Sequence, residues 1–177
     1  YTLKGNVLSV KTTFVPDTSV VKSLARIGLA FEMPYLYNKV SYLGRGEHET
    51  YVDRDRSGKI GIYHTDAEAM FHYYVRPQAT GNRADVRWAT VTDGDGEGLL
   101  FGSGKNFQFS VVPFTDENID SADHINQLER TGIVTVHLDA EQTGVGTATC
   151  GPGVLPKYWI PVKKHEFNFT FSPYREK

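Results

Sequence analysis

The sequence predicts an all-β protein, a large antiparallel β-sandwich with one or two short helices. Aromatic residues are abundant, with ten Tyr, ten Phe and two Trp, and 17 Gly accompany them. Apolar and polar residues alternate with a period of two in many short segments, and clusters of Gly, Pro, Asn and Asp separate these segments. The 177 residues suit one domain, 1–177, because no linker or internal repeat divides them.

The alternation locates the strands. Over residues 166–171 three Phe side chains alternate with polar ones, which describes a strand with one wet face. The same pattern marks residues 26–33 and 107–111. Further strands are expected at residues 6–14, 40–43, 60–63, 85–92, 99–101 and 133–139.

Helix is scarce in this pattern. Thr65 and Glu68 have the spacing of a capping box, which predicts one or two helical turns through Phe71. A second short helix is predicted to start at Thr115, with Ile119 buried.

Charge and composition narrow the classes of partner. Lys and Arg total 19 against 21 Asp and Glu, the net charge is −2, and no basic stripe is present. We therefore expect no nucleic-acid or membrane partner, and no apolar run is long enough to span a bilayer. The single Cys150 excludes an internal disulfide. A soluble protein is expected, and the sequence leaves open whether it is cytoplasmic or periplasmic.

Metal and phosphate motifs are incomplete. Residues 93–98 resemble the start of a calcium loop, but Gly104 stands where the final acidic ligand belongs, so a hairpin tip is expected. The six His residues have no metal-ligand spacing. We expect no metal and no cofactor in this domain.

Five blocks of sequence occur in the order of the motifs of a known family. LARIGL (24–29) resembles its LPRxGL strand, and YLGRGEHETYVDR (42–54) resembles YLGRGPxENYxDR. YVRPQ (74–78) followed by GNRADVRW (81–88) is similar to YxxPQExGNRxDVRW. FQFS (107–110) and GVGTATCGP (144–152) match a strand and a GxGxxSWGP loop. Over residues 24–171 the chain thus resembles the last domain of large bacterial β-galactosidases of glycoside hydrolase family 2.

This resemblance implies a fold and a function. The fold would be the supersandwich shared with galactose mutarotases. The chain, which begins at Tyr1 without Met, would be the C-terminal fragment of an enzyme that releases terminal β-D-galactose with retention of configuration. The catalytic glutamates, with any Mg²⁺ or Na⁺ beside them, would lie in a barrel domain of the same chain that binds the β-galactoside. This fragment would contain no catalytic residue, and the parent enzyme would be a homo-oligomer.

The 144–152 loop carries the functional expectation. In the family the corresponding loop reaches the mouth of the barrel, where its Trp forms a wall beside the sugar. Here Cys150 takes that position, so the substrate-rim candidates are Thr149, Cys150 and Gly151. Because Cys lacks a ring face, weaker stacking on the sugar is expected. The alternative is that Cys150 is a small buried apolar residue.

A charged set lies near the family motifs and comprises Arg45, Glu47, Glu49, Asp53, Arg54, Arg83, Asp85 and Arg87. We expect a buried or half-buried network of Arg–carboxylate bonds that pins loops to the sandwich, with direct sugar binding as the alternative. Gly44 and Gly46 flank Arg45, which predicts positive φ on either side of it.

Two other functions remain open. A stand-alone sugar-processing domain of the aldose-epimerase type would need a general acid and base, for which His137 is a candidate. A non-catalytic carbohydrate-binding module would use exposed aromatic residues such as Tyr158 and Trp159. Under the main reading the isolated chain should fold and show no activity on a chromogenic galactoside.

Overall fold

The structure is a computed structural model that describes residues 1–146 and 153–176. Within these residues it has nine strands and two short α-helices. The elements are β1 (Thr2–Lys4), β2 (Val7–Phe14), β3 (Arg26–Pro34), β4 (Lys39–Gly46), β5 (Lys59–Asp66), α1 (Ala67–Met70), β6 (Arg83–Thr92), β7 (Glu97–Val112), α2 (Asp116–Ser121), η1 (Ile125–Gln127), β8 (Ile133–Gln142), η2 (Pro156–Tyr158) and β9 (His165–Arg175). The strands pair antiparallel, which confirms the predicted fold class.

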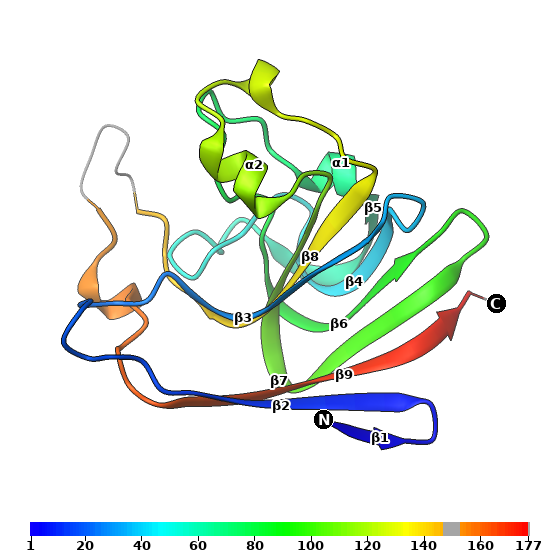
Figure 1. Cartoon of the computed structure of the whole chain (residues 1–177), viewed down its shortest axis with the longest axis horizontal. Coiled ribbons are helices and arrows are strands. Elements are labelled where there is room, and N and C mark those ends of the chain that lie inside the picture. Colours follow the sequence, from blue (N-terminus) through cyan, green and yellow to red (C-terminus); the bar gives the residue numbers. More distant parts are fainter. Residues whose placement is uncertain (147–152, 177) are drawn as a thin grey trace.

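The long strand β7 organises the sheet. One edge of β7 pairs with β6, which leads on to β4 and β5. Its other edge pairs with β9 over residues 97–103 and with β8 over residues 108–112. The sheet therefore splits at β7 into one arm of β9, β2 and β1 and another of β8 and β3 (Figure 1).

The two arms pack face to face. Phe31 of β3 lies 5.7 Å from Phe101 of β7 and 5.6 Å from Phe171 of β9, measured between ring centroids. Phe107 and Phe109 are fully buried in the same core, as the alternation predicts. The sandwich is thus one continuous sheet folded over its own core.

The predicted strands and helices differ from the structure in three respects. Residues 99–101 and 107–111 belong to one strand, β7, which runs on through the residues between them. The short strand β1 and the turns η1 and η2 were not predicted. The N-cap of α1 is Asp66, whose carboxylate accepts from the amide of Ala69 over 2.9 Å, whereas Thr65 still pairs with Val40 in the sheet. Thr115 caps α2 as predicted.

The glycines beside Arg45 serve a purpose other than the predicted one. Neither Gly44 nor Gly46 has positive φ, and both lie inside β4, so that prediction is wrong. A Cβ at Gly46 would run into the Tyr42 hydroxyl and would lie 2.9 Å from the Tyr63 ring. These positions need Gly because neighbouring side chains pack directly against the strand.

None of the helices in the described residues is long and apolar enough to cross a membrane.

Candidate functional site

Two distant segments meet at one end of the sandwich. The first is the 47–58 connection between β4 and β5, and the second follows β8 (Figure 1). The Asp53 carboxylate joins them: it accepts from the Val145 amide over 3.0 Å and from the Gly146 amide over 2.7 Å. A single side chain thus holds a backbone segment more than 90 residues away in sequence.

The chain returns to the same place at residue 153. Gly146 has φ +61°, and a Cβ on it would lie 2.8 Å from the carbonyl carbon of Gly153 and from the Val154 nitrogen. The Trp159 indole donates to the Val154 carbonyl over 3.0 Å, and the Thr143 hydroxyl donates to the Tyr158 carbonyl over 3.1 Å. We call residues 143–146 and 153–154 the loop stem.

The substrate-rim candidates Thr149, Cys150 and Gly151 lie outside the described residues. Their role therefore stays a prediction. The described residues end at Gly146 and resume at Gly153 on either side of them.

Glu49 is the most heavily bonded carboxylate beside the stem. It pairs with Arg54 and accepts from the hydroxyls of Tyr74 and Thr80 and from the amide of Gly81. Its side chain is 12% exposed. Burial by itself would raise the pKa of Glu49, but these hydrogen bonds and the Arg54 charge outweigh burial and lower the pKa to about 2. Glu49 is thus held as a carboxylate that fixes the 74–81 segment.

Arg45 forms a second unit with Asp85. Its Nε lies 2.5 Å from the Asp85 carboxylate, and its Nη1 donates to the Gly58 carbonyl over 3.0 Å. Asp85 has φ +54°, at a register shift in the β6–β7 pairing. Arg87 donates to the Asp85 main-chain carbonyl over 2.6 Å. This unit fastens the 55–58 turn to β6.

Arg83 is placed differently from the other arginines. It is 2% exposed and donates to the Tyr42 hydroxyl and to the carbonyls of Gly81 and Asn82. In residues 1–146 and 153–176 it forms no ion pair, and exposed Glu47 makes no hydrogen bond or ion pair either. The predicted charged set therefore divides into separate units, and the Asp53 carboxylate binds backbone amides.

The sequence analysis named His137 as a candidate general acid or base, but it did not identify the two side chains that bond to it, Ser110 and Asp116. The His137 ring, 4% exposed, lies 3.1 Å from the Ser110 hydroxyl and 2.9 Å from the Asp116 carboxylate. The hydrogen bond with His137 lowers the pKa of Asp116. Both ring nitrogens are engaged, Ser110 is buried and the Asp116 carboxylate is 53% exposed, so the group fastens α2 to the sheet.

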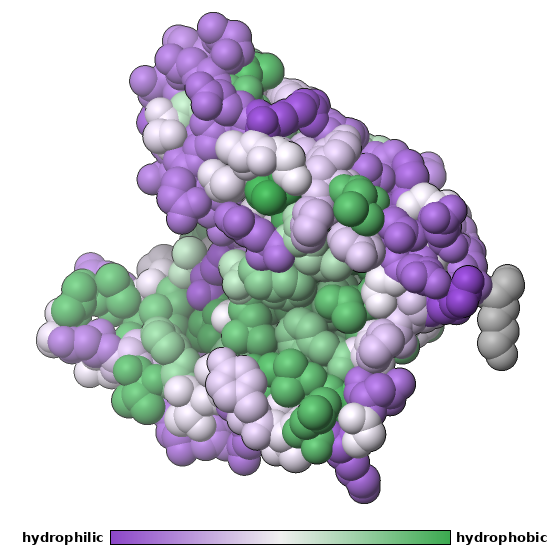
Figure 2. All heavy atoms as spheres, turned by 45° about the vertical axis from the view of Figure 1, so that its right-hand side comes forward, coloured by the Kyte–Doolittle hydropathy of each residue, from purple (hydrophilic) through white to green (hydrophobic). Residues whose placement is uncertain are grey.

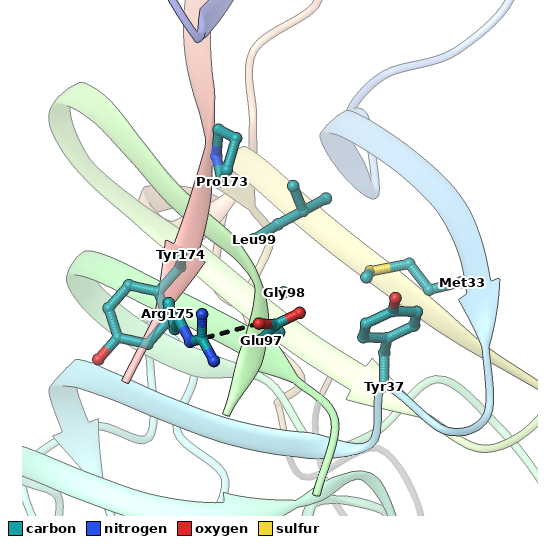
Figure 3. Close-up of a pocket in the computed structure, with 8 residues that line it drawn as sticks. All are labelled: Met33, Tyr37, Glu97, Gly98, Leu99, Pro173, Tyr174 and Arg175. Atoms are coloured by element: carbon teal, nitrogen blue, oxygen red, sulfur yellow. Dashed lines mark ion pairs between the residues drawn. The ribbon is translucent and has the colours of Figure 1, made fainter. Parts of the chain in front are cut away.

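An apolar cavity of about 610 Å³ lies elsewhere, where the end of β3 faces β7 and β9. Figure 2 shows apolar side chains gathered in the hollow on this side. Met33, Tyr37 and Leu99 surround the cavity, and an ion pair of 3.3 Å between Glu97 and Arg175 lies at its edge (Figure 3). The loop stem adjoins the opposite end of β3, since Arg26 pairs with Gln142 there.

Metal ligands do not converge in the part of the chain that the structure describes. No group of three or more His, Cys, Asp or Glu side chains there is placed to hold an ion.

Comparison with known proteins gives concordant results. The sequence profile of a family described as "Beta galactosidase small chain" matches residues 1–172. A protein named β-galactosidase from Priestia megaterium is 30% identical over 139 residues, which are 78% of this chain and 13% of that protein. The β-galactosidase of Kluyveromyces lactis is 31% identical over 176 residues, 97% of this chain and 16% of that protein. The chain therefore spans about a seventh of the length of these relatives.

Proposed function

The chain belongs to the β-galactosidase small chain family, and on this premise we propose that it is the C-terminal domain of a retaining β-galactosidase, which we call the parent enzyme. The parent enzyme would hydrolyse terminal non-reducing β-D-galactose residues. This domain would stiffen the assembly and contribute Thr149, Cys150 and Gly151 to the rim of the active site. The catalytic glutamates, any Mg²⁺ or Na⁺, and the β-galactoside would be bound by other parts of the parent, a homo-oligomer.

The state of the carboxyl groups supports a catalytic centre outside this domain. A retaining glycosidase needs two carboxyl groups about 5 Å apart, one of them an acid with a raised pKa. Among the described residues, the carboxyl groups with a clear change in pKa all have it lowered: Asp17, Glu49, Glu68, Asp116 and Glu166. Each accepts hydrogen bonds that favour the charged form, which suits a structural role.

Activity of the separate domain tests the division of labour. The purified 177-residue chain should fold, as shown by a cooperative unfolding transition, and should not turn over a chromogenic galactoside. The parent enzyme, prepared in the same way, should turn it over. Turnover by the highly purified chain alone would contradict the proposal.

The rim role is tested in the parent enzyme by Cys150→Trp. A ring at this position adds a stacking face for the sugar, so the KM for an aryl β-galactoside should fall by about fivefold. The matched control is Leu155→Trp, which adds the same ring at an exposed position outside the 147–152 segment and should leave KM unchanged. An unchanged KM in the Cys150→Trp enzyme would remove the rim role.

A sugar-binding platform is the second candidate, because Trp159 is 42% exposed beside the loop stem. The Lys157 ammonium lies 4.7 Å from the centre of the neighbouring Tyr158 ring. Of these two adjacent rings, Trp159 is therefore the one available to stack on a sugar. This function would be favoured if the isolated chain binds galactose and the Trp159→Ala variant does not. It would be excluded if the unaltered chain does not bind galactose.

A further inference from the structure

We propose that a cavity between α2 and the 76–79 segment binds a neutral saccharide unit, the galactosyl ring of a β-galactoside. We call it the α2 cavity. Its walls are residues 76–79, Arg26 at the start of β3, and Asp116, Ile119 and Asp120 of α2. The volume is about 580 Å³, which is within the range of small-molecule sites. Only the choice of a galactoside as the saccharide rests on the function proposed above.

The first support is that two polar side chains of the cavity are oriented by buried residues of one strand. Asp139 of β8, 3% exposed, accepts from the Arg26 Nε over 3.1 Å. His137, two residues earlier on the same face of β8, lies 2.9 Å from the Asp116 carboxylate. The Arg26 and Asp116 side chains are themselves 29% and 53% exposed. A buried layer thus fixes the two groups that a ligand would meet, which is how preorganised binding sites are built.

The second support is the bonding capacity that these two groups keep. Among the described residues the Asp116 carboxylate bonds only to His137, and this hydrogen bond lowers the pKa of Asp116, which keeps the acceptor charged. Arg26 uses its Nε and Nη2 on Asp139 and has further N–H donors to offer. The hydroxyls of a sugar both donate and accept, so a neighbouring pair of hydroxyls can bond to the carboxylate and the guanidinium together.

The third support is the apolar part of the wall. Pro77 and Ile119 line the cavity, and both are buried in the fold. A pyranose ring presents C–H groups as well as hydroxyls, and its C–H groups can pack on these two side chains. Polar groups on one side and apolar groups on the other therefore match the two kinds of surface of a sugar.

The charges of the cavity disfavour ionic ligands. Arg26 is paired with Asp139, and Arg76 lies 3.5 Å from Asp123. Both guanidinium groups are thus already balanced, while the carboxylates of Asp116 and Asp120 would repel an anion. The same guanidinium groups would repel a cation. A neutral ligand that can both donate and accept hydrogen bonds remains, and a saccharide is such a ligand.

Nuclear magnetic resonance of the 177-residue chain tests the proposal, with methyl β-D-galactoside as the probe. The backbone amides of residues 76, 78, 79 and 116–120 should shift on titration and give a Kd of about 1 mM, which is typical of a ligand of this size. Amides of β1 and β2, far from the cavity in the sheet, should not shift.

Two variants act on the cavity in different ways. Asp116→Asn replaces a charged acceptor with a neutral one that has a single oxygen, so the Kd should rise at least fivefold. Ala79→Leu leaves the polar groups in place and fills part of the cavity from the exposed 76–79 segment, so the Kd should rise at least as much. Glu117→Gln is the matched control, since it removes the same charge from the same helix at an exposed position outside the cavity.

The outcomes separate this inference from the two functions considered above. No shift of these amides at about 20 mM probe, some 20 times the expected Kd, would overturn it. So would binding that persists in both Asp116→Asn and Ala79→Leu, or binding that is lost in Trp159→Ala, which would assign the sugar to the Trp159 platform. Turnover of a galactoside by the parent enzyme is measured separately. A parent without turnover would therefore remove the proposed function and leave binding in the α2 cavity standing.

Discussion

The guanidinium of Arg83 donates to the Tyr42 hydroxyl over 2.9 Å in the interior of the sandwich, and it lies 5.9 Å from the centre of the Tyr42 ring. It also donates to the carbonyls of Gly81 and Asn82. A buried cation is thus solvated by neutral oxygens, which ties the 81–82 turn to β4. This arrangement makes Arg83 sensitive to substitution.

Arg83→Ala should destabilise the chain by about 3 kcal/mol, because it removes the donor from the buried Tyr42 hydroxyl and Gly81 carbonyl and opens a cavity. Urea unfolding followed by circular dichroism measures the change. Arg87→Ala, at an exposed position of the same strand, should change the free energy of unfolding by less than about 0.5 kcal/mol. Equal effects of the two substitutions would show that the Arg83 contacts contribute nothing to stability.

The Glu49 carboxylate should make stability depend on pH. Its pKa is about 2 in the folded chain against 4.5 for the free group, so its stabilising effect is complete above pH 4.5 and is lost as the pH falls towards 2. The difference between the two values corresponds to about 3 kcal/mol. The advantage of the unaltered chain over Glu49→Gln in urea unfolding should shrink by about this amount between pH 6 and pH 2. A constant advantage would contradict the role given to the ionised form.

Gly46→Ala should destabilise the chain by about 2 kcal/mol, since the added methyl group collides with the Tyr42 hydroxyl and the Tyr63 ring. Gly94→Ala is the matched control: its Cβ would meet no atom within 4 Å, and the substitution restricts the unfolded chain, so it should be neutral or slightly stabilising. Thermal unfolding of the two variants compares them directly. An unchanged unfolding temperature in Gly46→Ala would mean that β4 moves to make room for the methyl group.

The sequence predicted well those features that depend on local pattern. Alternation placed Phe107 and Phe109 in the core, and Thr115 was identified as a helix cap. It failed where one continuous strand carries polar residues, as at residues 102–106 of β7. Alternation has no signal for a strand that leaves one partner and joins another.

The candidate site was harder to predict. Asp53 was assigned to an Arg network as a member of a charged set. Its hydrogen bonds come instead from backbone amides, and every residue type except Pro carries such an amide, so the sequence does not mark them. The available signal was the pair Gly144 and Gly146, whose missing side chains leave room for a carboxylate. Likewise, His137 lies more than 20 residues from Ser110 and Asp116 in sequence, and the pairing of β7 with β8 brings it next to them.

Asp116→Asn is expected to weaken the attachment of α2 in a pH-dependent manner. The hydrogen bond with His137 lowers the pKa of Asp116, so the carboxylate stabilises the fold above its ordinary value of 3.8 and this contribution is lost as the pH falls below it. At pH 6 the substitution should cost about 1 kcal/mol, the contribution of one partly exposed charged hydrogen bond.

Asp120→Asn, on an exposed position of the same helix, provides the control and should change stability by less than about 0.5 kcal/mol. Near pH 3 the unaltered chain begins to lose the Asp116 charge too, so the gap between it and Asp116→Asn should narrow. A gap that stays the same at pH 6 and pH 3 would mean that the shape of the side chain, and not its charge, holds α2 against His137. Urea unfolding at the two pH values decides between these outcomes, because the two side chains have nearly the same shape.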